Sequence, residues 1–443
     1  MRTLVATMGA VRRASAIAVA VVLGIATSAV AQPAGTDKTG GYIVFPKVVV
    51  DSAGALIGSP TDTLIQISNT DLINPRPVDC TWVNATSFCG DPVAGCPGAT
   101  TTACNTSADC PGGLQCIPCW SETDFPMVLT PGQPIAFHAG SGEALPCFGF
   151  PLPTGCLDDN QGAISPAPGD PFVGELKCVQ TTVFDEPPNA PLAARNDLVG
   201  EATIISTDPD PLAGPTTLRT ASYDAYAFPT SAAADGTDGG APLCLGGFSA
   251  AGAPTPLANP CGDADCGLTY AGCPAVLILN HFFEGAPNVL GDGPGTFVRT
   301  NLTLVPCSEA VFSGNDINQQ AITTAQFLIY NEFEQRYSAS TRVQCFKDIP
   351  LADIDSRPGS SDDAFSIFSV GVQGTMTGQT RIRGVAGQED NLGHGLIGIA
   401  QEFYLNGGLE VESAAYELHG DGDRQQGDAV CRLEGFFPPP VGP

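Results

Sequence analysis

The sequence predicts an all-β protein made of two tandem antiparallel β-sandwiches, of immunoglobulin-like or jelly-roll type, with disulfide-stapled loop inserts. Apolar and polar residues alternate along most segments between turns, which is the two-residue period of a β-strand. The chain has 52 glycines and 39 prolines among its 443 residues, which is too many for long helices. Similar segments recur in the same order in two parts of the chain, which favours a tandem arrangement.

The clearest element is a β-hairpin predicted at residues 326–350. Phe327, Ile329 and Phe333 share one face of its first strand by alternation, and apolar residues also lie on the other face. Because both faces carry apolar groups, we expect an interior pair of strands rather than a solvent-exposed sheet edge. The small polar residues Gln335–Ser340 are typical of the connecting turn.

The other strands are predicted in order along the chain from their apolar and β-branched residues. In the first part they lie at residues 42–51, 63–84 (a second hairpin), 124–139, 172–182, 198–207 and 221–228. In the second part they lie at residues 275–283, 297–307, 364–372, 378–385, 396–404 and 414–420. The predicted domains are a first sandwich at 42–230, a connector with one strand at 231–294, a second sandwich at 295–435 and a proline-rich tail at 436–443.

The two parts match element by element when the hairpin at 63–84 is taken as the counterpart of the hairpin at 326–350. The matched positions are Asn69 with Asn331, Val78 with Val343, Cys80 with Cys345, Leu198–Ala202 with Leu396–Ala400, and Tyr223 with Tyr416. The shared order of several weak matches indicates two homologous sandwiches. The alternative is coincidence, because period-2 alternation recurs in unrelated β-domains.

Residues 1–31 have the pattern of a secretory signal peptide. Arg2, Arg12 and Arg13 flank or precede a short apolar run, and Ala29–Ala31 supplies the small-residue cleavage pattern. No later segment has the uninterrupted apolar length of a membrane span. We therefore expect a secreted protein, located outside the cell, in a periplasm or at the cell surface. The scarcity of lysine favours a bacterial source.

The mature chain is strongly acidic. Loss of the three signal-peptide arginines leaves 15 basic residues against 46 acidic ones, a formal net charge of −31. This charge argues against nucleic acid as a partner and is compatible with divalent cations. Asp421, Asp423 and Asp428 form the best candidate calcium site, although Gln425 breaks the EF-hand pattern and a plain solvated turn is the alternative. No other cofactor is predicted.

Seventeen cysteines, all in the mature chain, predict an oxidising compartment and a disulfide framework. Because their number is odd, one cysteine is free, binds a ligand or pairs between chains. The insert at residues 89–119 is the densest region, and we take it as a candidate recognition loop. The candidate residues are Cys104, Cys110, Cys116, Cys119 and Trp120. The alternative is that these cysteines staple a long loop, and disulfides outweigh zinc binding behind a signal peptide.

These observations favour a non-enzymatic structural or adhesive protein, because repeated sandwiches commonly serve as spacers or binding units. Self-association or a partner at the cell surface is expected, since open sandwiches present strand edges. The alternative is a soluble ligand- or glycan-binding protein that uses the cysteine-rich insert. A secreted hydrolase ranks third, with Glu332 and Glu334 as carboxylates on one face of the central strand.

Overall fold

The chain folds into antiparallel sheets joined by loops and very short helices. The computed structural model describes residues 34–91, 93, 99–105, 107–119, 121–143, 164–183, 193–207, 218–230, 243–245, 268–270, 273–287, 296–306, 322–344, 346–355, 366–385, 395–406 and 409–423. Strand makes up 63% and helix 6%, so the prediction of an all-β protein is confirmed. Within the described residues, no helix has the length and apolar character needed to cross a membrane. The predicted signal peptide and C-terminal tail lie outside these residues.

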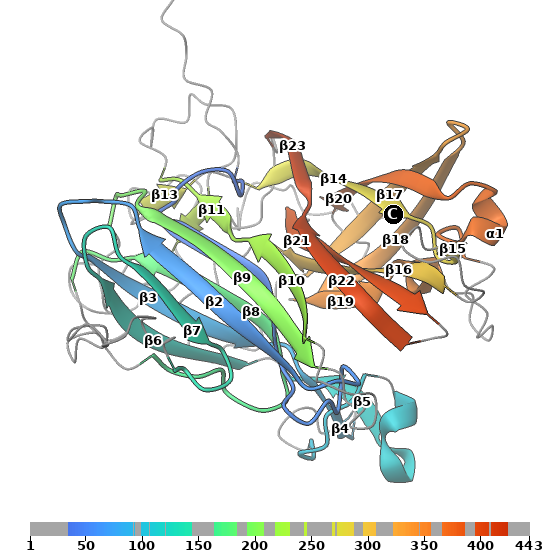
Figure 1. Ribbon diagram of the computed structural model, residues 1–443, viewed down its shortest axis with the longest axis horizontal. Helices are drawn as coiled ribbons and strands as arrows, with labels where there is room; N and C mark the ends of the chain where they lie inside the picture. Colours follow the sequence, from blue (N-terminus) through green and yellow to red (C-terminus); the bar gives the residue numbers. More distant parts are fainter. Residues whose placement is uncertain are drawn as a thin grey trace, which may run out of the picture.

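The first half consists of two sheets that enclose one hydrophobic core, drawn in blue to lime in Figure 1. The larger sheet has the strand order β11-β1-β8-β3-β6, and the smaller has the order β10-β9-β2-β7. The strands are β1 (Tyr42–Val50), β2 (Thr61–Asn69), β3 (Arg76–Asn84), β6 (Ser121–Leu129), β7 (Pro134–His138), β8 (Phe172–Gln180), β9 (Leu198–Thr207), β10 (Leu218–Asp224) and β11 (Tyr226–Phe228). Trp82 lies fully buried in this core, with its ring centroid 5.7 Å from that of Phe125. A disulfide between Cys80 and Cys178 joins β3 to β8 beside it.

The second half, drawn in yellow to red in Figure 1, also has two sheets around a core of its own. One sheet has the order β18-β17-β20-β14-β23, and the other has the order β15-β16-β21-β22, with β19 paired to β16. The strands are β14 (Pro274–Phe282), β15 (Ala286–Pro287), β16 (Thr296–Pro306), β17 (Ile322–Asn331), β18 (Arg336–Gln344), β19 (Lys347–Pro350), β20 (Thr377–Val385), β21 (Leu396–Asn406), β22 (Leu409–Glu417) and β23 (His419–Asp423). Phe327 and Ile329 of β17 and Leu302 of β16 are buried between these sheets. Strand β14 therefore packs with the second half.

Small elements complete the described structure. β4 (Ser87–Gly90) pairs with β5 (Gln115–Pro118) inside the insert, and β12 (Leu243–Leu245) pairs with β13 (Leu268–Tyr270). The helices are η2 (Ser107–Asp109), η3 (Pro111–Gly113), η5 (Leu351–Asp355) and α1 (Val370–Gln373). The strand predicted at residues 364–372 is wrong, because Ser366–Ser369 form a hydrogen-bonded turn that leads into α1.

The sheet orders of the two halves correspond strand for strand. Taken in chain order, β1, β2, β3, β6, β7, β8, β9, β10 and β11 correspond to β14, β16, β17, β18, β19, β20, β21, β22 and β23. The register agrees as well: Ala202 lies between Ile65 and Tyr223, and Ala400 lies between Leu302 and Tyr416. By this correspondence β17 is the counterpart of β3, whereas the sequence matching made β18 the counterpart of β3.

The sequence prediction of the central hairpin is confirmed, but two of its details are wrong. β17 pairs with β18, and the connecting turn is Glu332–Gln335 rather than Gln335–Ser340. The amide N–H groups of Phe333 and Gln335 donate to the side-chain oxygen of Asn331, which closes the turn early. β18 is a sheet edge rather than an interior strand, and Phe333 is 66% exposed.

The predicted hairpin at residues 63–84 does not form. β2 pairs with β7 and β9 in the smaller sheet, whereas β3 pairs with β6 and β8 in the larger one. Asn69 and Asp71 shape the loop between them, where Arg76 forms ion pairs with Asp71 and Asp197. The alternation of side chains was identical for either pairing, so the sequence pattern did not distinguish them.

The two halves are in direct contact. Edge strands β10 and β22 lie against each other, and Ile399 of β21 packs into the first core. The hydroxyl of Tyr226 lies 2.8 Å from the carbonyl oxygens of both Gly398 and Leu418. As a result, the four large sheets are arranged like the blades of a four-bladed propeller and do not clearly divide into tandem sandwiches.

Candidate functional site

The cysteine-rich insert projects from the lower edge of the first half in Figure 1. It connects β3 to β6, and the corresponding connection in the second half is the short turn Glu332–Gln335. The pairing of β4 with β5 forms its base, where Cys89 lies directly opposite Cys116. The insert therefore extends a hairpin connection, and it does not follow a return strand as the sequence matching implied.

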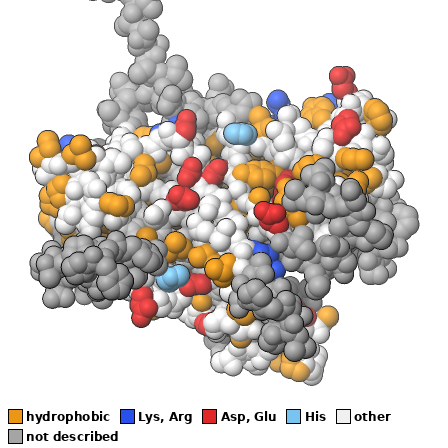
Figure 2. Space-filling view, viewed as in Figure 1, with side chains coloured by type: hydrophobic (Ala, Val, Ile, Leu, Met, Phe, Trp, Pro, Cys, Tyr) orange, Lys and Arg blue, Asp and Glu red, His pale blue; other side chains and the backbone are white. Residues whose placement is uncertain are grey.

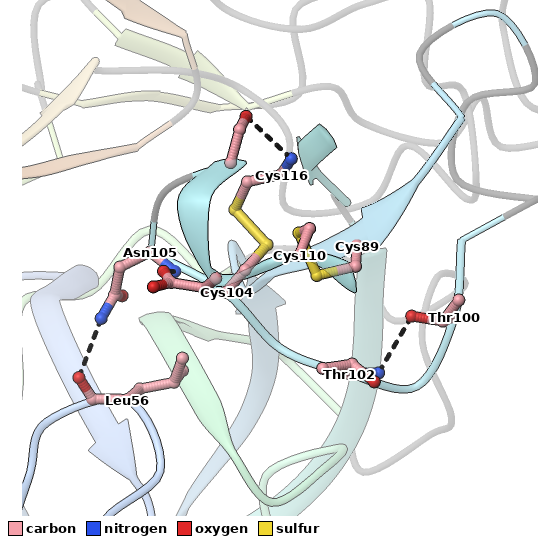
Figure 3. Close-up of a disulfide and its surroundings, with 10 residues drawn as sticks. Leu56, Cys89, Thr100, Thr102, Cys104, Asn105, Cys110 and Cys116 are labelled. Carbon is pink, nitrogen blue, oxygen red and sulfur yellow. Dashed lines mark hydrogen bonds between the residues drawn. A yellow bond between two sulfur atoms is a disulfide. The ribbon is translucent and has the colours of Figure 1, made fainter. Parts of the chain in front are cut away.

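Two disulfides hold the insert together, as Figure 3 shows. Cys89 bonds to Cys110 and Cys104 bonds to Cys116, which confirms the predicted disulfide framework for these residues. Cys119 is also disulfide-bonded. Cys89 and Cys104 are buried, while most residues around them are exposed. So short a segment cannot bury an apolar core of its own, and the disulfides stabilise it instead.

The sulfur atoms of Cys89, Cys104 and Cys110 lie close enough together to resemble a metal-ligand cluster. Both disulfides use these atoms, and a sulfur in a disulfide is no thiolate donor. Their proximity is therefore explained by covalent pairing. It provides no zinc site.

A few hydrogen bonds attach the insert to the body of the first half. The side-chain amide of Asn105 donates to the carbonyl oxygen of Leu56 at 2.9 Å (Figure 3). Just before the insert, the Thr86 hydroxyl accepts a hydrogen bond from the backbone N–H of Val173 at 2.9 Å. Within the insert, the Cys116 N–H donates to the Ser107 hydroxyl at 3.2 Å. These contacts hold an exposed surface in a defined orientation. Trp120, the aromatic member of the candidate recognition loop, lies outside the described residues.

The candidate calcium residues lie on a strand rather than in a loop. Asp421 and Asp423 belong to β23, where they pair with Val276 and Pro274 of β14. Asp428 lies outside the described residues, and calcium binding stays a prediction.

Glu332 and Glu334 do not form the carboxylate pair on which the hydrolase hypothesis depended. Both lie in the turn after β17, and Glu334 has a φ of 60°, so strand alternation does not apply to them. Hydrogen bonds from the Thr377 hydroxyl and N–H hold the pKa of Glu332 below its usual range. The shared strand face that suggested a carboxylate pair is therefore absent.

A buried ion pair lies on the outer face of the first half's larger sheet. Lys177 Nζ is 3.0 Å from Glu175 Oε1, and both side chains are almost fully buried. Burial raises the pKa of Glu175, and the charge of Lys177 partly opposes that shift. Across the sheet, the Thr81 hydroxyl donates to Asp124 at 2.7 Å. No solvent reaches the pair, and we interpret it as a structural polar layer beneath the residues that cover this face.

Comparison with protein-family models and with curated proteins finds no match to this chain. The interpretation of its function therefore depends on the chemistry and arrangement of its own residues.

Sequence reasoning missed a second candidate surface, the outer face of the second-half sheet with the order β18-β17-β20-β14-β23. Arg336 and Arg342 lie on β18, and Arg381 and Arg383 lie on β20, all exposed. We call these four residues the arginine face. Their even spacing within each strand was visible in the sequence and places each pair on one side of its strand. The strand pairing that brings the two pairs together was not visible.

Proposed function

We propose that this chain is an exported, non-enzymatic structural or adhesive protein built from two homologous β-sandwich units of immunoglobulin-like or jelly-roll type. The first unit covers residues 42–230 and carries the insert at 89–119. The second begins at β14, earlier than residue 295, and extends to about residue 435. Disulfides in the described residues support a location outside the cytoplasm, in the periplasm, at the surface or in the medium of a bacterium.

The strand-for-strand correspondence supports the proposed duplication. Gly200 of β9 and Gly398 of β21 occupy the same register position, two residues before Ala202 and Ala400. At each glycine an added Cβ would lie too close to a neighbour, 2.4 Å from Phe45 Cζ and 2.3 Å from the Thr303 carbonyl oxygen. The sequence matching of Leu198–Ala202 with Leu396–Ala400 agrees with this register.

The equivalent tyrosines give further support. The Tyr416 hydroxyl lies 2.9 Å from the carbonyl oxygen of Asn280 in β14. The Tyr223 hydroxyl donates to the carbonyl oxygen of Lys47 in β1, the strand that corresponds to β14. Two tyrosines from corresponding strands thus make the same kind of bond to the first strand of their own half. This shared tertiary contact supports the proposed duplication over coincidental alternation.

The observation that carries the structural role is the set of buried polar contacts between the two halves. Lys47 of β1 forms an ion pair with Asp348 of β19, and the Tyr226 hydroxyl is buried against the second half. A spacer or adhesive module must keep its units in a fixed orientation, and buried polar contacts provide that constraint. Flexible linkers between units would not transmit a defined geometry.

The test is the mass of the mature protein by light scattering after size exclusion, with and without reductant and calcium chelator, together with its retention on cells. We expect concentration-dependent assemblies or cell-bound protein. A clean monomer under all conditions, found free in the medium, would contradict the structural role. Loss of assemblies on reduction would implicate a cysteine between chains, and loss on chelation would implicate Asp421 and Asp423.

A second candidate function is ligand or glycan binding through the insert. The specific observation in its favour is that two disulfides stabilise a mostly exposed segment that has no counterpart in the second half. Rigid display of exposed loops is a common basis of recognition. A glycan array with the full chain tests it, compared with a variant in which residues 89–119 are replaced by a four-residue turn. Binding that survives this replacement would exclude the insert.

A further inference from the structure

The arginine face is arranged by strand register. In β18, Val343 is buried against the core, so Arg336 and Arg342 alternate onto the outer side. In β20, buried Ile382 separates the exposed residues Arg381 and Arg383. β17 lies between the two strands, so the four guanidinium groups spread over roughly 20 Å by 10 Å at standard strand spacings.

Three of these arginines have no carboxylate partner among the described residues. Arg336, Arg381 and Arg383 make no ion pair there, whereas Arg76 pairs with two aspartates and Arg299 with Glu284. Arg383 instead donates to the side-chain oxygen of Gln326 at 3.2 and 3.3 Å, which holds its guanidinium on the outer face. In a chain with 46 acidic and 18 basic residues, three such exposed arginines on one face form a local positive surface.

The corresponding face of the first half is not open. Thr81, Glu175 and Lys177 lie on the outer side of the larger sheet, and each is at most 1% exposed. Corresponding faces of the two units therefore differ: one is covered in the folded chain, and the other exposes Arg336, Arg381 and Arg383 to solvent. The contrast marks the arginine face as a surface that can be covered by a partner.

An acidic counterpart lies at the junction of the two halves. Asp224 of β10 is directly opposite Glu201 of β9, and the Asp224 N–H donates to the carboxylate of Glu417 in β22. We call Glu201, Asp224 and Glu417 the acidic seam. Figure 2 shows acidic side chains gathered near the middle of the visible face, where β9, β10 and β22 meet. Like charges directly opposite each other in a sheet are destabilising, and a positive partner relieves that repulsion.

We propose that the arginine face of one molecule docks on the acidic seam of a second copy of this chain. The proposal rests on the structural function proposed above and names the surfaces that carry it. Because the two surfaces differ, the contact is heterologous, and unless rotation closes a ring it continues into an open head-to-tail series. At physiological ionic strength the screening length is about 8 Å, so the net negative charge of each copy does not cancel local pairing.

Charge reversal with compensation tests the proposal. One variant carries Arg381→Glu and Arg383→Glu, and a second carries Glu201→Arg and Asp224→Arg. We expect each variant alone to lose self-association by about 100-fold or more, since the charges that should pair then repel. An equimolar mixture of the two should recover association, because each reversed surface then meets its complement. Near-UV circular dichroism confirms that both variants remain folded.

The control is Arg195→Glu, which makes the same change in net charge as Arg381→Glu at an exposed residue outside the arginine face. It should associate like the wild-type protein. Association that persists in both reversed variants, or that does not return in the mixture, would overturn the proposal while leaving the structural function standing. A monomeric wild-type protein that binds alginate beads through Arg381 and Arg383 would overturn the docking proposal and identify a polyanion as the occupant of the arginine face.

Discussion

Lys47 and Asp348 are 301 residues apart in the chain, yet the Lys47 ammonium lies 2.9 Å from a carboxylate oxygen of Asp348. The lysine side chain is only 4% exposed, and Asp348 also accepts a hydrogen bond from the Thr303 hydroxyl at 2.7 Å. The pair connects the first strand of one half to an edge strand of the other. It therefore reports directly on whether the halves fold as one unit.

The substitution Asp348→Ala should destabilise the protein strongly, because it leaves a buried ammonium without its partner. We expect the free energy of unfolding to fall by about 3 kcal/mol. The control is Glu284→Ala, which removes the partner of Arg299, a side chain that is 40% exposed. That change should cost less than about 1 kcal/mol. Urea titration of both variants measures the difference, and equal losses would contradict this view of the contacts between the two halves.

His281 should make stability depend on acid. Its ring is buried beside Phe283, with Nε2 2.8 Å from the Thr380 hydroxyl, and burial lowers its pKa to about 4. The unfolded chain takes up the proton near pH 6.5, so stability is fully present above that pH and is lost as pH falls toward 4. The loss is about 3 kcal/mol. Urea titrations between pH 4 and 7 should show a flatter profile for His281→Gln than for the wild-type protein, and an unchanged profile would contradict this role of His281.

Glu402 should act with the opposite sign. The Tyr416 hydroxyl lies 2.9 Å from the Asn280 carbonyl oxygen and 3.0 Å from Glu402, and its one proton cannot fully serve both acceptors. Burial raises the pKa of Glu402, and the hydrogen bonds from the Tyr404 and Tyr416 hydroxyls only partly oppose that shift. Stability is then complete below about pH 4.5 and is lost as pH rises through the raised pKa.

The variant Glu402→Gln has an uncharged side chain at every pH. It should remove this loss, and thermal melts from pH 4 to pH 8 will show whether its profile is flatter than that of the wild-type protein. Glu143→Gln, at an exposed carboxylate, is the matched control and should behave like the wild type. If both variants track the wild type, the titration of Glu402 does not contribute to the pH dependence of stability, and this prediction is wrong.

The disulfides of the insert and of the core should differ in their effect on stability. Cys104 and Cys116 close a 12-residue separation in an exposed segment, whereas buried Cys80 and Cys178 close a separation of 98 residues. Replacing Cys80 and Cys178 with alanine should lower the free energy of unfolding by about 4 kcal/mol. Replacing Cys104 and Cys116 with serine should speed hydrogen exchange within the insert and leave the sheets protected. If the sheets also unfolded in the second variant, the insert would not be stabilised independently of the sheets, and the prediction would be wrong.

Most of the strands were predictable from the sequence, because alternation is a local property. β8, β9, β20 and β21 lie where their patterns indicated, as does the pairing of β17 with β18. The partners of β2 and β3 were not predictable, since alternation is the same whichever strand pairs. The early turn after Asn331 was missed because Glu334 adopts a positive φ, which non-glycine residues rarely do.

The candidate sites were less predictable than the strands. The spacing of Cys104, Cys110 and Cys116 indicated a disulfide-stabilised insert. Which cysteines bond to each other, Cys89 with Cys110 and Cys104 with Cys116, was known only from the folded structure. Arg381 and Arg383 alternate visibly in the sequence, yet their neighbours across the sheet come from a strand more than 35 residues earlier in the chain. Surfaces assembled from separate strands depend on which strands pair, and this pairing cannot be read from the alternation pattern of a single sequence.

The placement of the insert has a practical consequence for protein engineering. In the second half, a turn of four residues connects β17 to β18. In the first half, the corresponding connection from β3 to β6 is a disulfide-bonded segment of more than thirty residues. A junction that already accepts such different lengths is a natural graft point. Foreign peptides or small domains placed between Glu332 and Gln335 should be displayed in a fixed orientation without disturbing the core, which would make this chain a compact display scaffold.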